Sequence, residues 1–138
     1  MPVYSLTTPQ TLNDTLKEKL ANMFTDVHCG LTGAPEQFVH VLFSDGIPIA
    51  GGKQLYVHAN IRDGRTPETV EAVRNDLATR SAEILNIDPS LVWVNLLEIS
   101  AKWAMEGGYV MPGPGEEDEW MEKVTAALAE REKENAAQ

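Results

Sequence analysis

One order of elements occurs twice in this chain: a strand, a Thr-Pro pair, a helix and a second strand. Thr8-Pro9 ends the first strand pattern, and Thr66-Pro67 repeats the signal roughly half a chain later. A threonine hydroxyl caps a helix and proline fits its first turn, so each pair predicts a helix start. A strand, a crossover helix and a parallel strand form a βαβ unit. The sequence therefore predicts an α/β fold in which two βαβ units form a four-stranded sheet with both helices on one face.

The spacing of apolar residues places these elements. Apolar side chains at three- and four-residue steps predict the first helix over about residues 9–31, and Gly30 and Gly33 stand where it should end. A similar stripe follows Thr66-Pro67. The strands are expected in MPVYSLTT, QFVHVLFSD, QLYVHANIR and LVWVNLLEI. One face of such a sheet stays open and apolar, so we expect other subunits to cover it.

The chain after residue 100 has a different character. A Gly/Pro-rich loop, EGGYVMPGPGEEDEW, precedes a short acidic helix that Trp120, Val124 and Leu128 are expected to pack down. The last residues, KENAAQ, are expected to fray. We therefore predict a single domain over residues 1–138, of which 101–138 form a C-terminal loop, helix and tail.

Charge and composition exclude several classes of function. The formal net charge of −10 argues against a nucleic-acid partner, which needs a basic surface. The single cysteine suits a reducing compartment, and no leader or membrane-spanning apolar run is present, so the expected location is cytoplasmic, without membrane contact. His28, His40 and His58 lack the spacing of metal ligands, and no metal or organic cofactor is expected.

The position of Pro2 has two possible interpretations, one structural and one catalytic. At the first position of a strand, proline does little harm, because its missing N–H is not needed there. If Met1 is removed, however, the Pro2 nitrogen becomes a secondary amine. A free α-amino group has a pKa of roughly 7.7–8.0, and burial lowers it, so such an amine can act as a general base near neutral pH.

Four further residues are candidates for a site, each with a simpler alternative. In IRDGRTP, Arg62 ends a strand and Arg65 precedes a helix start, which suits an anion clamp; both can equally be surface charges. His28 lies near a helix end, where it can bind a ligand or only interact with the helix dipole. Glu106 begins the glycine-rich loop and can activate water or simply be solvated.

Taken together, these residues are more specific than any one of them. The chain resembles the tautomerase superfamily and, within it, the cis-3-chloroacrylic acid dehalogenase group. The resemblance lies in MPVY, TDVHCGLTG, IRDGR, VWVNLLE and MEGGYVMPGPGEEDEW, which follow the family's order over roughly residues 1–120. It implies a cofactor-independent enzyme that acts on small carboxylates and assembles as a homotrimer.

The resemblance also implies a role for each candidate. The catalytic proline of the family falls on Pro2, its carboxylate-binding histidine on His28, its arginine pair on Arg62 and Arg65, and its water-activating glutamate on Glu106. Pro2 and Glu106 are thus the expected catalytic residues, and the other three are expected to bind substrate.

The chain departs from the family at Asn95, where the family carries a tyrosine that assists the glutamate. An amide can bind substrate but offers no titrating proton. We therefore expect a keto–enol tautomerase with weak hydratase and cis-3-haloacrylate dehalogenase activity. Two alternatives stay open: a dedicated hydrolytic dehalogenase or hydratase in which Tyr109 replaces the missing phenol, and a non-catalytic binding module on the same scaffold.

Overall fold

The computed structural model describes residues 2–138, and the predicted removal of Met1 lies outside them. The chain divides into two compact units, one up to Glu98 and one over Ile99–Gln138. The first is built from β1 (Val3–Thr8), α1 (Asp14–Thr32), β2 (His40–Asp45), β3 (Leu55–Arg62), α2 (Pro67–Leu85) and β4 (Val92–Ile99). The second holds β5 (Met105–Glu106), β6 (Tyr109–Val110) and α3 (Glu117–Ala136).

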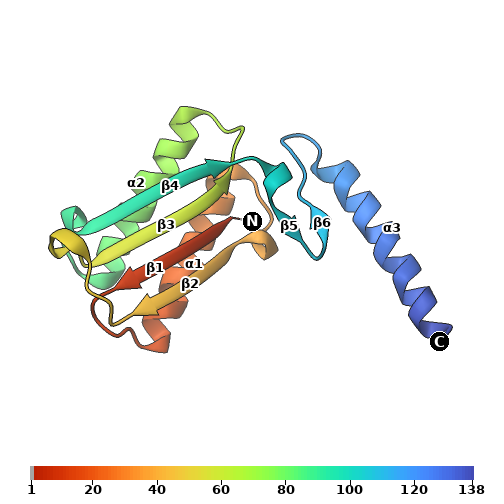
Figure 1. The fold of residues 1–138 in the computed structure, drawn as a ribbon. Helices are drawn as coiled ribbons and strands as arrows, with labels where there is room; N and C mark the ends of the chain where they lie inside the picture. Colours follow the sequence, from red (N-terminus) through yellow and green to blue (C-terminus); the bar gives the residue numbers. More distant parts are fainter. Residues whose placement is uncertain (1) are drawn as a thin grey trace. The chain divides into compact units, whose positions relative to one another are not determined.

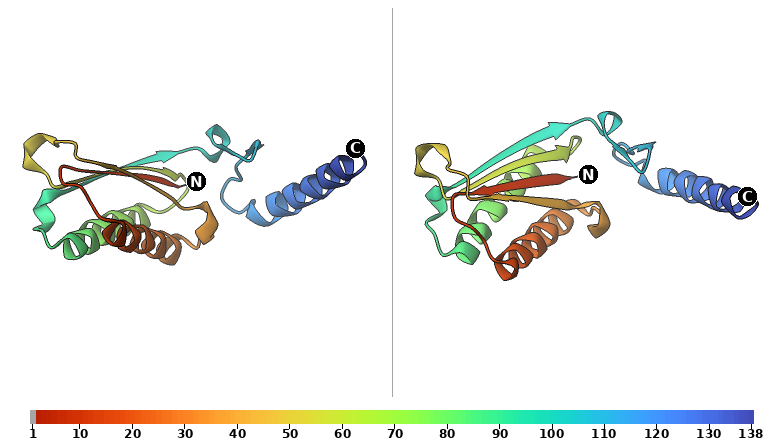
Figure 2. Two further views of the ribbon diagram at one scale, coloured as in Figure 1. Left: turned by 90° about the horizontal axis from the view of Figure 1, so that it is seen from below. Right: turned by 60° about the horizontal axis from the view of Figure 1, so that its bottom comes forward.

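The main sheet has the strand order β2-β1-β3-β4. Strand β1 is parallel to β2 and antiparallel to β3, and β3 and β4 run in the same direction (Figure 1). Helices α1 and α2 lie side by side on one face of this sheet (Figure 2). The predicted pair of βαβ units with both helices on one face is therefore confirmed.

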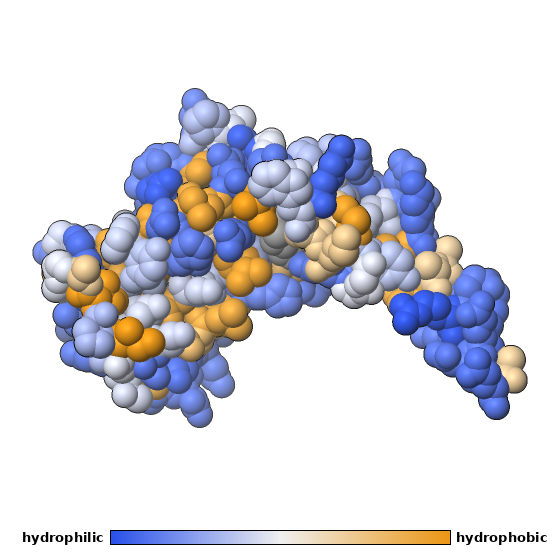
Figure 3. Space-filling view, in the orientation of Figure 1, coloured by the Kyte–Doolittle hydropathy of each residue, from blue (hydrophilic) through white to orange (hydrophobic). Residues whose placement is uncertain are grey.

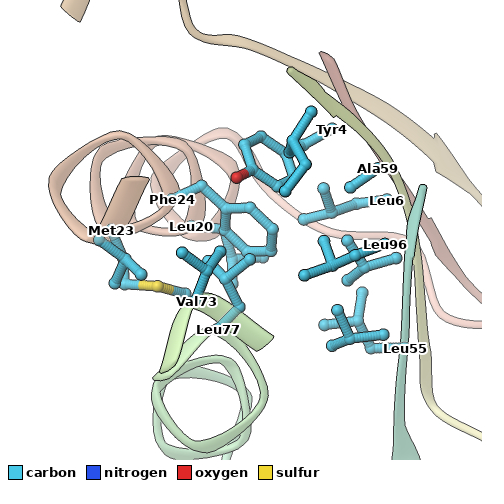
Figure 4. Close-up of a cluster of buried hydrophobic side chains, with 14 of the residues drawn as sticks. Tyr4, Leu6, Leu20, Met23, Phe24, Leu55, Ala59, Val73, Leu77 and Leu96 are labelled. Atoms are coloured by element: carbon cyan, nitrogen blue, oxygen red, sulfur yellow. The ribbon is translucent and has the colours of Figure 1, made fainter. Parts of the chain in front are cut away.

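The core lies between the sheet and the two helices. Alternate residues of β3 from Leu55 to Ile61 are fully buried, as the period of a strand requires. They pack with inward side chains of β1 and with Phe24 of α1 and Leu77 of α2 (Figure 4). This packing fixes which side of each strand faces the helices and which faces away.

The two Thr-Pro signals have different outcomes. Thr66 caps α2 and accepts a hydrogen bond from the Thr69 amide, with Pro67 in the first turn, as predicted. The predicted start of the first helix at Thr8-Pro9 is wrong, because Thr8 is the last residue of β1 and Asn13 caps α1 instead. Asn13 and threonine are both good caps, and pairing of β1 with β2 as far as Thr8 delays the helix. Gly33 ends α1 with a φ of 74°, whereas Gly30 lies within it.

The second unit departs from the prediction in its helix. Helix α3 has 20 residues and runs through most of the segment that was expected to fray, because Ala, Glu and Lys are strong helix formers. Trp120 donates its indole N–H to the Val110 carbonyl at 2.6 Å and so ties the helix to β6. Leu128 is 47% exposed, and none of the residues of α3, all of which the structure describes, is buried. Within the second unit, Leu128 therefore does not pack into a core, and its predicted packing stays a prediction.

The sheet face away from the helices carries exposed apolar side chains. Leu42, Trp93 and Leu97 are 57%, 47% and 45% exposed. Figure 3 shows apolar residues among polar ones over this part of the molecule. Among the helices of residues 2–138, none combines the length and the apolar character needed to cross a bilayer.

Candidate functional site

Strand pairing brings the start of β1 next to the end of β3. Val3 lies opposite Asn60 in the antiparallel ladder, so Pro2 stands beside the last residues of β3, where Arg62 is found. On the other side, the Pro2 carbonyl accepts a hydrogen bond from the His40 amide at 3.1 Å. Pro2 is itself fully buried. Pro2, the residue before β1, is thus buried at the edge of the ladder and hydrogen-bonded through its carbonyl to the first residue of β2.

His28 reaches the same end of the sheet from α1. Its side chain is fully buried, and its Nδ1 lies 2.6 Å from the hydroxyl oxygen of Tyr4, on β1. Figure 4 shows the Tyr4 hydroxyl pointing toward α1. The other ring nitrogen, Nε2, is buried and has no hydrogen-bond partner among residues 2–138. A buried polar atom without a partner is uncommon, which marks Nε2 as a candidate for a functional role.

Two guanidiniums act on this buried pair. Burial lowers the pKa of His28 to about 3, and the positive charges of Arg65 and Arg62 add to the effect. Burial also raises the pKa of Tyr4, against the opposing influence of Arg65. Arg65 donates from Nη1 to the Arg62 carbonyl, which ties the two arginines together. At neutral pH the site therefore combines a neutral imidazole, a protonated phenol and two positive charges, an arrangement suited to a small anion.

Within one chain, Asn95 does not lie near His28, Arg62 and Arg65. Its neighbours Val94 and Leu96 face the core, so Asn95 points to the opposite, open face of the sheet. There its amide donates to the Tyr56 hydroxyl at 3.4 Å, and Tyr56 lies 3.4 Å from Nδ1 of His58. Asn95 thus belongs to a polar group on the face away from His28.

Glu106 lies in the second compact unit. It ends β5 and is the direct cross-strand partner of Tyr109 on β6. The turn between them is Gly107-Gly108, with φ values of 59° and 87° that glycine adopts without strain. Directly opposed residues project to the same face of a ladder, so the carboxylate and the phenol of this hairpin are neighbours.

No protein-family model matches the sequence, and no curated protein matches it. Among solved structures, N1, a member of the cis-3-chloroacrylic acid dehalogenase family, aligns with a TM-score of 0.82 and 27% identity over 94% of this chain and 96% of its own. Native Ps01740 aligns with a TM-score of 0.69 and 31% identity over 75% of this chain and 99% of its own. The chain belongs to the tautomerase superfamily.

A native fused 4-OT shares the fold, with a TM-score of 0.70 and 23% identity over 78% of this chain and 94% of its own.

Of the predicted site residues of this chain, four lie near one another at the same end of the sheet: Pro2, His28, Arg62 and Arg65. In residues 2–138, no group of three or more histidine, cysteine, aspartate or glutamate side chains could hold a metal ion.

Tyr4 is a site residue that sequence reasoning missed. Its signal was present: residues two apart on a strand share a face, so Tyr4 had to lie on the same side of β1 as Pro2. A buried phenol also requires a polar partner, which indicates a hydrogen bond within the core. What the sequence did not supply was the partner, which lies 24 residues away on α1.

Proposed function

We propose that this protein is an enzyme that uses Pro2, freed by removal of Met1, as a general base on small carboxylates with an adjacent enol or activated double bond. The observation that carries the proposal is the burial of Pro2 beside the end of β3, where Arg62 lies. Arg65 and Arg62 also act electrostatically on buried His28, whose Nε2 has no hydrogen-bond partner among residues 2–138. The preferred reaction is keto–enol tautomerisation.

In this reaction, the arginines hold the carboxylate and His28 donates a hydrogen bond from a neutral ring. The Pro2 nitrogen takes the proton of the enol hydroxyl while electrons move toward the adjacent double bond. It then returns that proton to carbon, so that the enol becomes a ketone and no atom is gained or lost. A 2-hydroxy-dienoate or an aryl enolpyruvate has the required groups.

Self-association is part of the proposal. The exposed Leu42, Trp93 and Leu97 leave the open face of the sheet with apolar surface that further copies can cover, which supports a homotrimer. Asn95 lies on that face. In a trimer, Asn95 would therefore contribute to substrate binding next to a neighbouring copy rather than beside His28 of its own chain.

The carboxylate clamp is tested with a charged substrate and its neutral ester. We expect the wild-type protein to convert phenylenolpyruvate and to convert its methyl ester much more slowly. Arg62→Ala and Arg65→Ala should each lower kcat/KM for the acid by about 2 kcal/mol, roughly thirtyfold, because one side of a charge pair is lost. Stopped or continuous ultraviolet assays of the enol measure this directly.

Arg80→Ala is the matched control, because Arg80 lies on an exposed position of α2. It should leave both substrates unaffected. Arg62→Lys should recover only part of the loss, since lysine keeps the charge but not the forked geometry. Equal kcat/KM for acid and ester in the wild type would contradict the proposed substrate class.

A second candidate function is hydrolytic dehalogenation of a cis-3-haloacrylate. The observation in its favour is the direct pairing of Glu106 with Tyr109 across the hairpin. Glu106 would take a proton from a water molecule while the oxygen of that water bonds to C3 of the substrate. Protonated Pro2 would then protonate C2. The resulting halohydrin then loses HX. Tyr109 would supply the phenol that the family carries at the position of Asn95.

If this pairing assists water, Tyr109→Phe should lower halide release from cis-3-chloroacrylate roughly tenfold, and Glu106→Gln should lower it further. Halide release and enol conversion are to be measured on the same preparations, and their ratio should fall. Tyr56→Phe serves as the control, because it removes a phenol from β3 in the first unit and leaves the hairpin itself unchanged. An unchanged ratio in both hairpin variants would exclude this role for Tyr109.

A further inference from the structure

We propose that Tyr4 is a positioning residue that donates its phenol proton to Nδ1 of His28 and thereby holds the ring as the tautomer with its proton on Nε2. That Nε2–H is then a neutral hydrogen-bond donor to an oxygen of the substrate. The catalytic consequence rests on the proposed function. The tautomer itself does not, because it is a property of the resting protein.

The two rings are fixed relative to each other. The Tyr4 hydroxyl oxygen and His28 Nδ1 are 2.6 Å apart, and both side chains are fully buried. The Tyr4 ring meets Phe24 edge-on at a centroid distance of 5.2 Å and an interplanar angle of 74°. Such packing leaves the phenol little freedom to turn its hydroxyl elsewhere.

Counting hydrogens favours one tautomer. If Tyr4 donates to Nδ1, that bond satisfies the phenol proton and the Nδ1 lone pair, and only the Nε2–H is left for a ligand. If Nδ1–H donated to the phenol oxygen instead, the phenol proton would be buried without an acceptor among residues 2–138. The Nε2 lone pair would be buried without a donor as well. Because each unmet buried group is costly, the first arrangement is the stable one.

The surroundings keep both groups in the required protonation states. Burial opposes the imidazolium, and Arg65 and Arg62 oppose it further. Burial likewise opposes the phenolate, so that Tyr4 keeps the proton it donates. The pair therefore carries no net charge, and the positive charge of the site comes from the two arginines.

A neutral donor suits the proposed reaction. An imidazolium could surrender its proton to an enolate oxygen and so compete with carbon for protonation. A neutral imidazole N–H is far less acidic and can only donate a hydrogen bond as the oxygen changes from enol to ketone. Proton movement is then left to Pro2, while His28 keeps the reacting oxygen in place.

The direct test is nitrogen NMR of the histidine side chains in the full-length protein without substrate, from about pH 8 to about pH 5. In the wild type, His28 should show a lone pair on Nδ1 and a proton on Nε2 throughout this range. In Tyr4→Phe, the ring should become a mixture of tautomers. A wild-type ring protonated on Nδ1, or on both nitrogens, would overturn the proposal even if Tyr4→Phe does not fold.

Tyr56→Phe is the matched control. Tyr56 also faces a histidine Nδ1, that of His58, at 3.4 Å, but on the other side of the sheet. Its removal should alter the signals of His58 and leave those of His28 unchanged. A Tyr4→Phe protein with an unaltered His28 tautomer would show that the phenol does not set it.

A kinetic comparison tests the role of Nε2. Tyr4→Phe should lower kcat/KM for an enol carboxylate roughly tenfold, as expected for one lost hydrogen bond. His28→Gln places an amide N–H near the position of Nε2, whereas His28→Asn places it near Nδ1, so Gln should retain more activity than Asn. The reverse order would overturn the assignment of Nε2 as the donor. Absence of turnover in the wild type would contradict the proposed function alone, since the NMR result stands without substrate.

Discussion

Pro2→Ala is expected to lower enol-to-keto turnover by roughly 10²- to 10⁴-fold, the usual contribution of a positioned general base. Pro2 is fully buried at the start of β1, and its ring fixes the direction of the amine. Alanine leaves a primary amine with more freedom and loses the packed ring. The measurement is kcat/KM for phenylenolpyruvate in wild type and variant at several pH values.

Two controls make the result specific. Intact mass spectrometry must first show that Met1 is absent, because an attached Met1 turns the Pro2 nitrogen into an amide without basicity. Pro9→Ala, in the segment after β1, removes a second proline and should leave turnover unchanged. Full activity in protein proven to retain Met1 would refute the proline mechanism.

The second large effect concerns stability and pH. His28 has a pKa of about 3 in the folded protein, below its ordinary value of about 6.5. Between these values the unfolded chain binds a proton that the folded chain does not. The free energy of unfolding is therefore highest above pH 6.5 and falls as the pH decreases toward 3. The slope approaches about 1.4 kcal/mol per pH unit, on the order of 5 kcal/mol over the whole window.

The groups that face His28 account for this direction. Burial is the main cause that disfavours an imidazolium here, and the positive charges of Arg65 and Arg62 disfavour it further, while Tyr4 on β1 is held in its neutral form by burial. Urea denaturation at pH 6.5 and pH 5 should show a loss about 2 kcal/mol larger in the wild type than in His28→Gln. Both proteins are to be compared at equal concentration.

His28→Gln removes the titrating group but leaves the surface carboxylates in place. Asp45 and Asp88 also have lowered pKa values, from hydrogen bonds with Lys17 and Ser90 respectively, and they contribute equally in both proteins. The difference between the two proteins therefore isolates His28. An identical pH dependence would mean that His28 takes up a proton in its ordinary range.

Much of the fold could be predicted from local sequence. The alternating pattern from Leu55 to Ile61 and the cap at Thr66 depend on interactions between residues close in the chain, and both are as predicted. The first helix start was misplaced because Thr8 and Asn13 are comparable caps, and only the pairing of β1 with β2 decides between them. Local preferences of similar size are resolved by tertiary contacts.

The candidate site could likewise be predicted only in part from the sequence. The order of Pro2, His28, Arg62, Arg65 and Glu106 along the chain was sufficient for the resemblance to the tautomerase superfamily. The sequence by itself thus determined which residue types are present and the βαβ units that carry them. It did not determine which side chains from different strands and helices meet, since that depends on how the elements pair and pack.

Only the tertiary structure decided the hydrogen bonds. Tyr4 and His28 meet because β1 packs on α1, and Asn95 turns away because Val94 and Leu96 on either side of it are needed in the core. Glu106 and Tyr109 become neighbours through a two-glycine turn. For Tyr4 and Asn95, the partner is selected by strand register and by the packing of one element on another, which depend on contacts between residues far apart in the sequence.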